Sequence, residues 1–224
     1  PSEVECLLNG EQMGEGWSDF FALVTTVEPG DASSDKQGIG SYVFRQPTDG
    51  AGVRRYAYST DMGINPLTYG NVADSPEEHA RGEVWTAMVW DLYWAFVEKY
   101  GYDADLNNTN SGNFRAIQLV MDGLKLQPCS PGTIDGRDAI LLADKMNYAG
   151  ADTCLISSVF ARRGLGVAAS QGSEDVPIDG KENFDPIPAC VKSLKINKIT
   201  TTPLVDPEGF ADYVLTVTNH KDAA

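Results

Sequence analysis

Apolar residues recur at helical spacing in five stretches of the 224-residue chain. The clearest is the second, where Val84, Met88, Leu92 and Phe96 follow one another every four residues along one face. The pattern therefore predicts a mainly α protein. The expected helices span residues 10–27, 75–100, 113–122, 135–146 and 152–163.

Residues that favour helix ends flank these stretches. Ser75 is expected to cap the second helix, with Pro76 at its first position and Glu78 completing a capping box. Gly123 and Gly164 are expected to end the third and fifth helices, because glycine adopts the left-handed backbone that follows many helices.

Residues 28–74 lack this periodicity and are rich in Gly, Asp, Ser and Pro. A long irregular region inside a compact domain is often functional. The short apolar runs 41–44 and 55–58 are candidates for strands within it.

The pattern changes after Cys190. Residues 194–199 and 213–218 alternate between apolar and polar positions, which predicts two strands. We therefore expect a helical lobe over residues 1–170, an acidic linker and domain end over 171–192, and the truncated start of a β-sandwich-like module over 193–224.

The charge of the chain narrows the classes of partner. Its 32 Asp and Glu outnumber 17 Lys and Arg, giving a net charge of -15, and such a surface repels nucleic acid and anionic lipid. No apolar run approaches the roughly 20 residues that span a bilayer. Residues 1–5 lack the basic start and apolar core of a signal peptide, so if the protein is exported, its signal is expected to precede this sequence.

Four cysteines allow two disulfides in three pairings. The favoured pairs are Cys129–Cys154, which would join the starts of two successive helices, and Cys6–Cys190, which would join the ends of the main domain. Four buried free thiols are the alternative. The absence of a C-x-x-C pair disfavours a cysteine zinc cluster.

Glu15 and Asp19 lie four residues apart on the first expected helix and project from one face. At this spacing one carboxylate can bind a metal while the other supports it. Gly14 and Gly16 flank Glu15, and because glycine costs about 1 kcal/mol in a helix interior, they indicate that something approaches the backbone closely. The alternatives are two solvated carboxylates, or the acid and base of a glycosidase, although such a pair rarely flanks a sugar.

The segment Met13–Phe20, MGEGWSDF, closely resembles the third-ligand motif of the fungalysin family of secreted zinc metallopeptidases. These are relatives of thermolysin, in which H-E-x-x-H is followed downstream by a glutamate ligand. Further blocks match in family order over roughly residues 10–170. They are Gly82–Trp85, Leu119–Cys129, Asp135–Ile140 and Phe160–Gly166.

The resemblance implies the helical C-terminal lobe of a thermolysin-like peptidase. It implies that Glu15 is a zinc ligand, that Asp19 orients a histidine ligand, and that His79 stabilises the oxyanion with Asp74 orienting it. The departure is that H-E-x-x-H is absent from this sequence. The chain alone is therefore expected to hold zinc poorly and to be inactive without an N-terminal lobe that carries this motif.

The expected function is part of a secreted zinc endopeptidase that acts on protein or peptide substrates. Two alternatives stay open. The chain could be a non-catalytic extracellular binding or adhesion module built on a peptidase lobe, and His79 could be an exposed histidine beside Glu77 and Glu78.

Two other motifs have weaker meanings. The pair Arg162-Arg163 is expected to hold helices together through ion pairs and carbonyl contacts. Asn107-Asn108-Thr109 is a glycosylation sequon, although such triplets often arise by chance.

Overall fold

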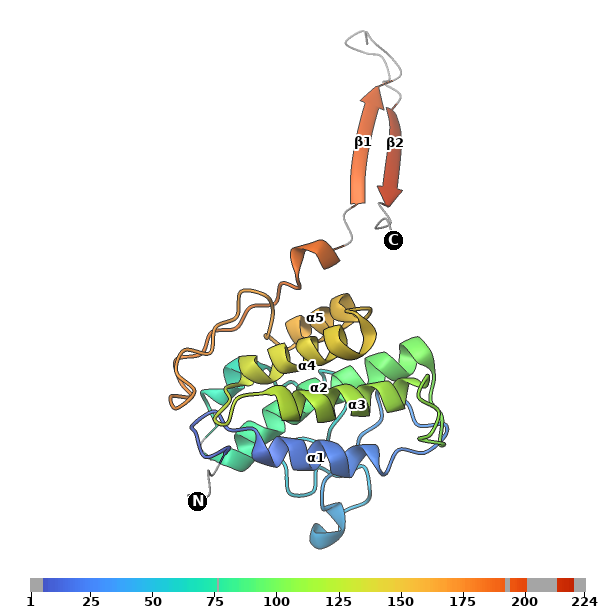
Figure 1. Cartoon of the computed structure of the whole chain (residues 1–224). Coiled ribbons are helices and arrows are strands. Elements are labelled where there is room, and N and C mark those ends of the chain that lie inside the picture. Colours follow the sequence, from blue (N-terminus) through green and yellow to red (C-terminus); the bar gives the residue numbers. More distant parts are fainter. Residues whose placement is uncertain (1–5, 76, 192–193, 201–212, 220–224) are drawn as a thin grey trace, which may run out of the picture. The chain divides into compact units, whose positions relative to one another are not determined.

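The computed structural model describes residues 6–75, 77–191, 194–200 and 213–219. It divides into two compact units, Pro1–Ile187 and Pro188–Ala224. The described residues confirm the mainly α prediction, with helices near all five expected stretches (Figure 1). The α-helices are α1 (Gly14–Val24), α2 (Glu78–Tyr100), α3 (Gly112–Leu126), α4 (Thr133–Tyr148) and α5 (Thr153–Arg162).

Short elements complete the described chain. The 3₁₀ helices are η1 (Ser41–Phe44), η2 (Tyr69–Val72) and η3 (Pro188–Cys190). Both strands that the alternation predicted are present in the second unit, where β1 (Leu194–Thr200) pairs antiparallel with β2 (Tyr213–Asn219), Leu194 opposite Asn219. Whether this pair begins a β-sandwich stays a prediction. Nowhere in the described part of the chain is a helix both long enough and apolar enough to cross a membrane.

Helix α2 is the centre of the first unit and packs against α1, α3 and α5 (Figure 1). It is buried on every side, as expected of a helix that carries large apolar residues all round. The ring of Trp85 stacks on Phe160 of α5 at 5.8 Å and meets Trp17 of α1 edge-on at 5.0 Å. The core therefore gathers around this one helix.

Helices α1 and α2 touch backbone to backbone. A Cβ on Gly16 would lie 2.4 Å from the carbonyl oxygen of Gly82, and a Cβ on Gly82 would lie 2.5 Å from the nitrogen of Gly16. The Thr86 hydroxyl lies 2.9 Å from the carbonyl oxygens of both. The close approach expected beside Glu15 is thus made by a neighbouring helix.

Two sequence predictions in the irregular region are wrong. Residues 41–44 form η1, because Gly40 (φ 65°) and Arg45 (φ 54°) turn the backbone at both ends. Residues 55–58 form no strand, and Tyr58 makes only an isolated bridge to Gln37. An extended run needs a partner strand, which this loop does not supply over more than one residue.

The structure also corrects two helix ends. Glu77, not Ser75, caps α2, since its carboxylate accepts the N–H groups of His79 and Ala80; Pro76 lies outside the described residues. Gly123 lies inside α3, where a Cβ would come within 2.6 Å of the Ile140 side chain on α4. Its small size serves helix packing and does not end the helix.

Both expected disulfides are wrong. Cys6 is bonded to Cys129, with 4.7 Å between their Cα atoms, and all four cysteines are oxidised, which excludes the free-thiol alternative. Cys129 precedes α4 whereas Cys154 follows it. A helix of 16 residues is about 24 Å long, far beyond the roughly 7 Å that a disulfide spans between Cα atoms.

Residues expected to be a linker lie in the first unit as far as Ile187. Gln171 accepts the backbone N–H of Ile134 at the start of α4 (3.1 Å). Glu182 accepts the N–H of Gly70 in η2 (2.7 Å). This segment therefore folds back along the helical lobe.

A buried ion pair ties α5 to α2. Arg163 is fully buried and binds both carboxylate oxygens of Asp91, at 2.7 and 2.9 Å. Its guanidinium also donates to the carbonyl oxygens of Ser59, Asn65 and Leu67. One side chain therefore attaches the irregular region to two helices. These are the ion pair and carbonyl contacts that were expected of the Arg162-Arg163 pair.

Replacing Arg163 tests this attachment. Arg163→Met leaves Asp91 buried without its main partner, and we expect a loss of about 3–5 kcal/mol in the free energy of unfolding. Arg162→Met is the matched control, because Arg162 contacts the same carboxylate but is half-exposed, and about 1 kcal/mol or less is expected. Urea denaturation measures both, and equal losses would contradict the assignment.

A second buried carboxyl group lies just before α1. Glu11 is 1% exposed and accepts hydrogen bonds from the Tyr69 hydroxyl (3.0 Å) and the Thr133 backbone N–H (3.1 Å). These donors are neutral, and burial raises the pKa of Glu11 from 4.5 to about 7. The negative charge of Asp179 acts in the same direction.

The raised pKa predicts a pH dependence. Because the folded state holds the Glu11 proton up to a pH of about 7 and the unfolded chain only to 4.5, stability should fall as pH rises through this window, by up to about 3 kcal/mol. Glu11→Gln, which imitates the protonated acid, should remove most of this fall. Unfolding at several pH values measures it, and exposed Glu28→Gln should leave the fall unchanged.

Candidate active site

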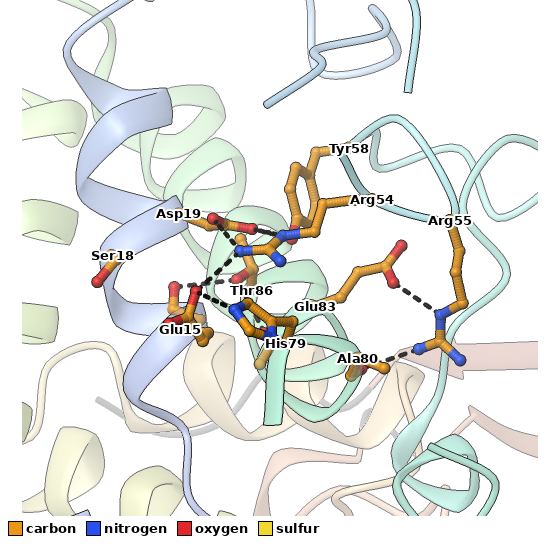
Figure 2. A network of polar contacts seen from close by, with 12 residues as sticks. Glu15, Ser18, Asp19, Arg54, Arg55, Tyr58, His79, Ala80, Glu83 and Thr86 are labelled. Atoms are coloured by element: carbon orange, nitrogen blue, oxygen red, sulfur yellow. Dashed lines mark hydrogen bonds and ion pairs between the residues drawn. The ribbon is translucent and has the colours of Figure 1, made fainter. Parts of the chain in front are cut away.

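The side chains of the candidate site come from three segments that meet at the α1–α2 crossing (Figure 2). Glu15 and Asp19 project from α1, and His79 lies in the first turn of α2. Arg54 and Tyr58 enter from the irregular region between them. The fold therefore brings His79 of α2 within 3.6 Å of Glu15, on the helix that also carries Asp19.

Glu15 faces an arginine and a histidine. Its Oε2 atom lies 3.3 Å from Nη2 of Arg54 and 3.6 Å from Nε2 of His79. The side chain is 38% exposed. Its Oε1 atom makes no hydrogen bond or ion pair within the described structure. Glu15 is therefore an accessible carboxylate with an oxygen free to bind a ligand.

Asp19 is buried and fully occupied. Its two oxygens accept Nε and Nη2 of Arg54, at 2.6 and 2.8 Å, in a bidentate pair. Oδ2 also accepts the Tyr58 hydroxyl at 2.6 Å, and burial raises the pKa of Tyr58 well above 10 so that it keeps its proton. The sequence expected Asp19 to orient a histidine; its partners in this chain are an arginine and a tyrosine.

His79 is oriented by an adjacent carboxylate. Its Nδ1 atom lies 2.5 Å from Oε2 of Glu77, and half of its side chain is exposed. Asp74, the expected partner, is exposed and makes no hydrogen bond or ion pair with His79 in the described structure. The contact with Glu77, aided by the charge of Glu15, raises the pKa of His79 above 6.5 and favours the imidazolium.

A second arginine fixes the loop. Arg55 donates to Glu83 on α2 (2.7 Å) and to the carbonyl oxygen of Ala80 (2.9 Å), while Glu83 also accepts the backbone N–H of Tyr56. Arg54 thus contacts α1, whereas Arg55 contacts α2 (Figure 2). This loop is held between α1 and α2.

Sequence reasoning missed Arg54, Tyr58 and Glu77. Arg54 could have been found from the sequence, because it belongs to an Arg-Arg pair in a strongly acidic chain and buried carboxylates need cationic partners. The sequence shows Glu77 only as an acidic neighbour of His79. Nothing in the sequence distinguishes a glutamate that caps a helix or binds the histidine from one that is simply exposed.

The carboxylates and histidine of this region are potential metal ligands. One group of three potential ligands occurs among the described residues, formed by Glu77, Glu78 and His79 with ligand atoms within 4.8 Å of one another. It lies at the N-terminus of α2, where Glu77 already accepts backbone N–H groups, and it does not include Glu15. The Glu15 carboxylate is chemically suited to be one ligand of a zinc ion, because zinc accepts oxygen donors from Asp and Glu.

Comparisons with known proteins identify related sequences. The sequence profile of the fungalysin metallopeptidase (M36) family matches residues 1–169. Extracellular metalloproteinase 1 of Trichophyton tonsurans is 39% identical over 195 residues, which cover 81% of this chain and 30% of that protein. Extracellular metalloproteinase MEP of Neosartorya fischeri is 38% identical over 183 residues, covering 78% and 28%.

The chain thus spans less than a third of the length of these relatives. The matched residues nevertheless include the whole α1–α2 crossing and the side chains gathered there. The chain belongs to the fungalysin metallopeptidase family.

Proposed function

We propose that this chain is part of a secreted zinc endopeptidase and contributes Glu15 as a zinc ligand. One observation carries the proposal. Glu15, an accessible carboxylate, lies 3.6 Å from the imidazole of His79 in a chain of a metallopeptidase family. The extracellular relatives and the oxidised cysteines support secretion, because disulfides persist in oxidising compartments.

The proposed division of labour follows from the contacts. Zinc held by Glu15 and further ligands would supply a water of lowered pKa for attack on a peptide carbonyl. Glu15 provides one ligand oxygen. The protonated His79 donates a hydrogen bond to the carbonyl oxygen of the substrate as negative charge develops there, and Glu77 holds the ring at Nδ1.

Arg54 positions the acidic side chains. Its guanidinium bridges Asp19 and Glu15, which balances two negative charges on one face of α1. Because Asp19 is buried and Arg54 is nearly so, this bridge fixes the direction in which α1 presents Glu15.

The chain needs further residues for activity. A catalytic zinc site takes three protein ligands, and H-E-x-x-H, which supplies two histidines and a general base in the resembling family, is absent from these 224 residues. We infer that an N-terminal lobe with this motif completes the site, and that the present chain alone is inactive.

The central test uses a longer protein that carries the motif. Glu15→Ala should lose zinc and nearly all peptidase activity. His79→Ala should keep zinc and lower kcat by on the order of 10²–10³, the cost of one oxyanion donor. Zinc content and peptide hydrolysis are measured for each variant, with exposed Glu78→Gln as the control that changes neither.

The isolated 224-residue chain provides the second arm of this test. Calorimetry should detect weak zinc binding or none, because a single side-chain ligand is present.

In the longer protein, full zinc content in Glu15→Ala, or normal kcat in His79→Ala, would contradict the proposal. A parent protein without H-E-x-x-H would instead favour the non-catalytic binding module.

A separate comparison identifies the partner of His79. Glu77→Gln should lower the pKa of His79, so the alkaline loss of kcat should begin at a lower pH, while the Gln oxygen can still cap α2. Asp74→Asn removes the carboxylate that the family resemblance suggested as the partner of His79. It should shift the alkaline loss of kcat less than Glu77→Gln does. The pH profiles of kcat decide, with unfolding curves as the control for helix capping; a larger shift in Asp74→Asn would reverse the assignment.

A further inference from the structure

The connection between α2 and α3 carries a motif that the peptidase function does not use. Asn107-Asn108-Thr109 is the only Asn-X-Ser/Thr triplet in the 224 residues. Residues 104–110 are all exposed, so the triplet lies in the middle of a solvent-facing segment. An acceptor triplet is meaningful only where the folded chain leaves room for a bulky polar group.

This loop keeps its shape without using the Asn107 side chain as an anchor. Buried Asn113, at the start of α3, accepts the backbone N–H of Asp103 (3.1 Å) and donates to its carbonyl oxygen (2.7 Å). The Asp103 carboxylate accepts the N–H of Asp105 and the side chain of Asn108. The loop is therefore attached to the body through Asp103 and Asn113.

The amide nitrogen of the Asn107 side chain, Nδ2, can be modified without losing its hydrogen bond. Its Nδ2 atom donates to Oδ1 of Asp105 at 2.7 Å. A carboxamide nitrogen carries two hydrogens, and this is the one hydrogen bond that Nδ2 makes in the described structure. One hydrogen can thus be replaced while the other continues to donate to Asp105.

We propose that Asn107 carries an N-linked oligosaccharide. In the transfer, Nδ2 forms a bond to the anomeric carbon of the sugar, and the bond from that carbon to a diphosphate oxygen of a lipid-linked oligosaccharide donor breaks. Nδ2 loses one proton, and the lipid diphosphate leaves with the bonding electrons. No oxidant is required, and the Thr109 hydroxyl completes the acceptor triplet.

The location of the triplet keeps the glycan away from the candidate active site. His79 lies in the first turn of α2, whereas the sequon follows the other end of this 23-residue helix, which is about 34 Å long. The glycan would instead lie next to Leu106, an exposed apolar side chain. Modification therefore shields surface without closing the site.

The test uses the 224-residue chain secreted from a eukaryotic host behind a cleavable signal. Intact mass is measured before and after the amidase that cleaves asparagine-linked glycans. We expect a heavier product whose extra mass the amidase removes. Peptide mapping should locate the conversion to aspartate at position 107.

Matched variants separate the modification from an effect on folding. Thr109→Ala and Asn107→Gln should both lose the added mass, whereas Thr109→Ser and Asn108→Gln should keep it because the triplet survives. An unmodified secreted wild-type chain, or amidase-sensitive mass that persists in Thr109→Ala, would overturn the proposal. The result is independent of zinc and of peptidase activity.

Discussion

The contact between Gly16 and Gly82 is the constraint on which the candidate site depends. Two helices can approach backbone to backbone only where neither carries a side chain, and a Cβ at either glycine would overlap the other helix. Glu15 immediately precedes one glycine, and His79 lies three residues before the other. Their proximity is therefore a direct consequence of the crossing.

The long irregular region gains order from buried charge. Arg54 and Arg55 attach it to α1 and α2, and Arg163 attaches its later part to α2 and α5. This region also packs into the core through Tyr58, Leu67, Tyr69 and Val72. The ionic contacts with Asp19, Glu83 and Asp91 add to that packing. In a chain of charge -15, these few arginines have a structural importance beyond their number.

The approach to α1 is also constrained from its N-terminal side. The Cys6–Cys129 bond and the hydrogen bond from Leu7 to the Cys129 carbonyl oxygen (3.0 Å) hold this segment against the α3–α4 connection. Glu11 then links it to Tyr69 and Thr133. The helix that presents Glu15 is thus fixed at its start as well as along its length.

The sequence by itself determined the helices, because periodicity and helix-breaking residues act locally, and it indicated through Gly14 and Gly16 that something approaches the backbone beside Glu15. Only the tertiary structure decided that this neighbour is α2, that Arg54 binds Asp19, and that Cys6 pairs with Cys129 across 123 residues. The same holds for Glu77 as the partner of His79. Local sequence patterns act over about the length of one helix, whereas contacts between residues distant in the sequence depend on the path of the whole chain. Cys129 and Cys154 are an example, because the length of α4 between them keeps them apart.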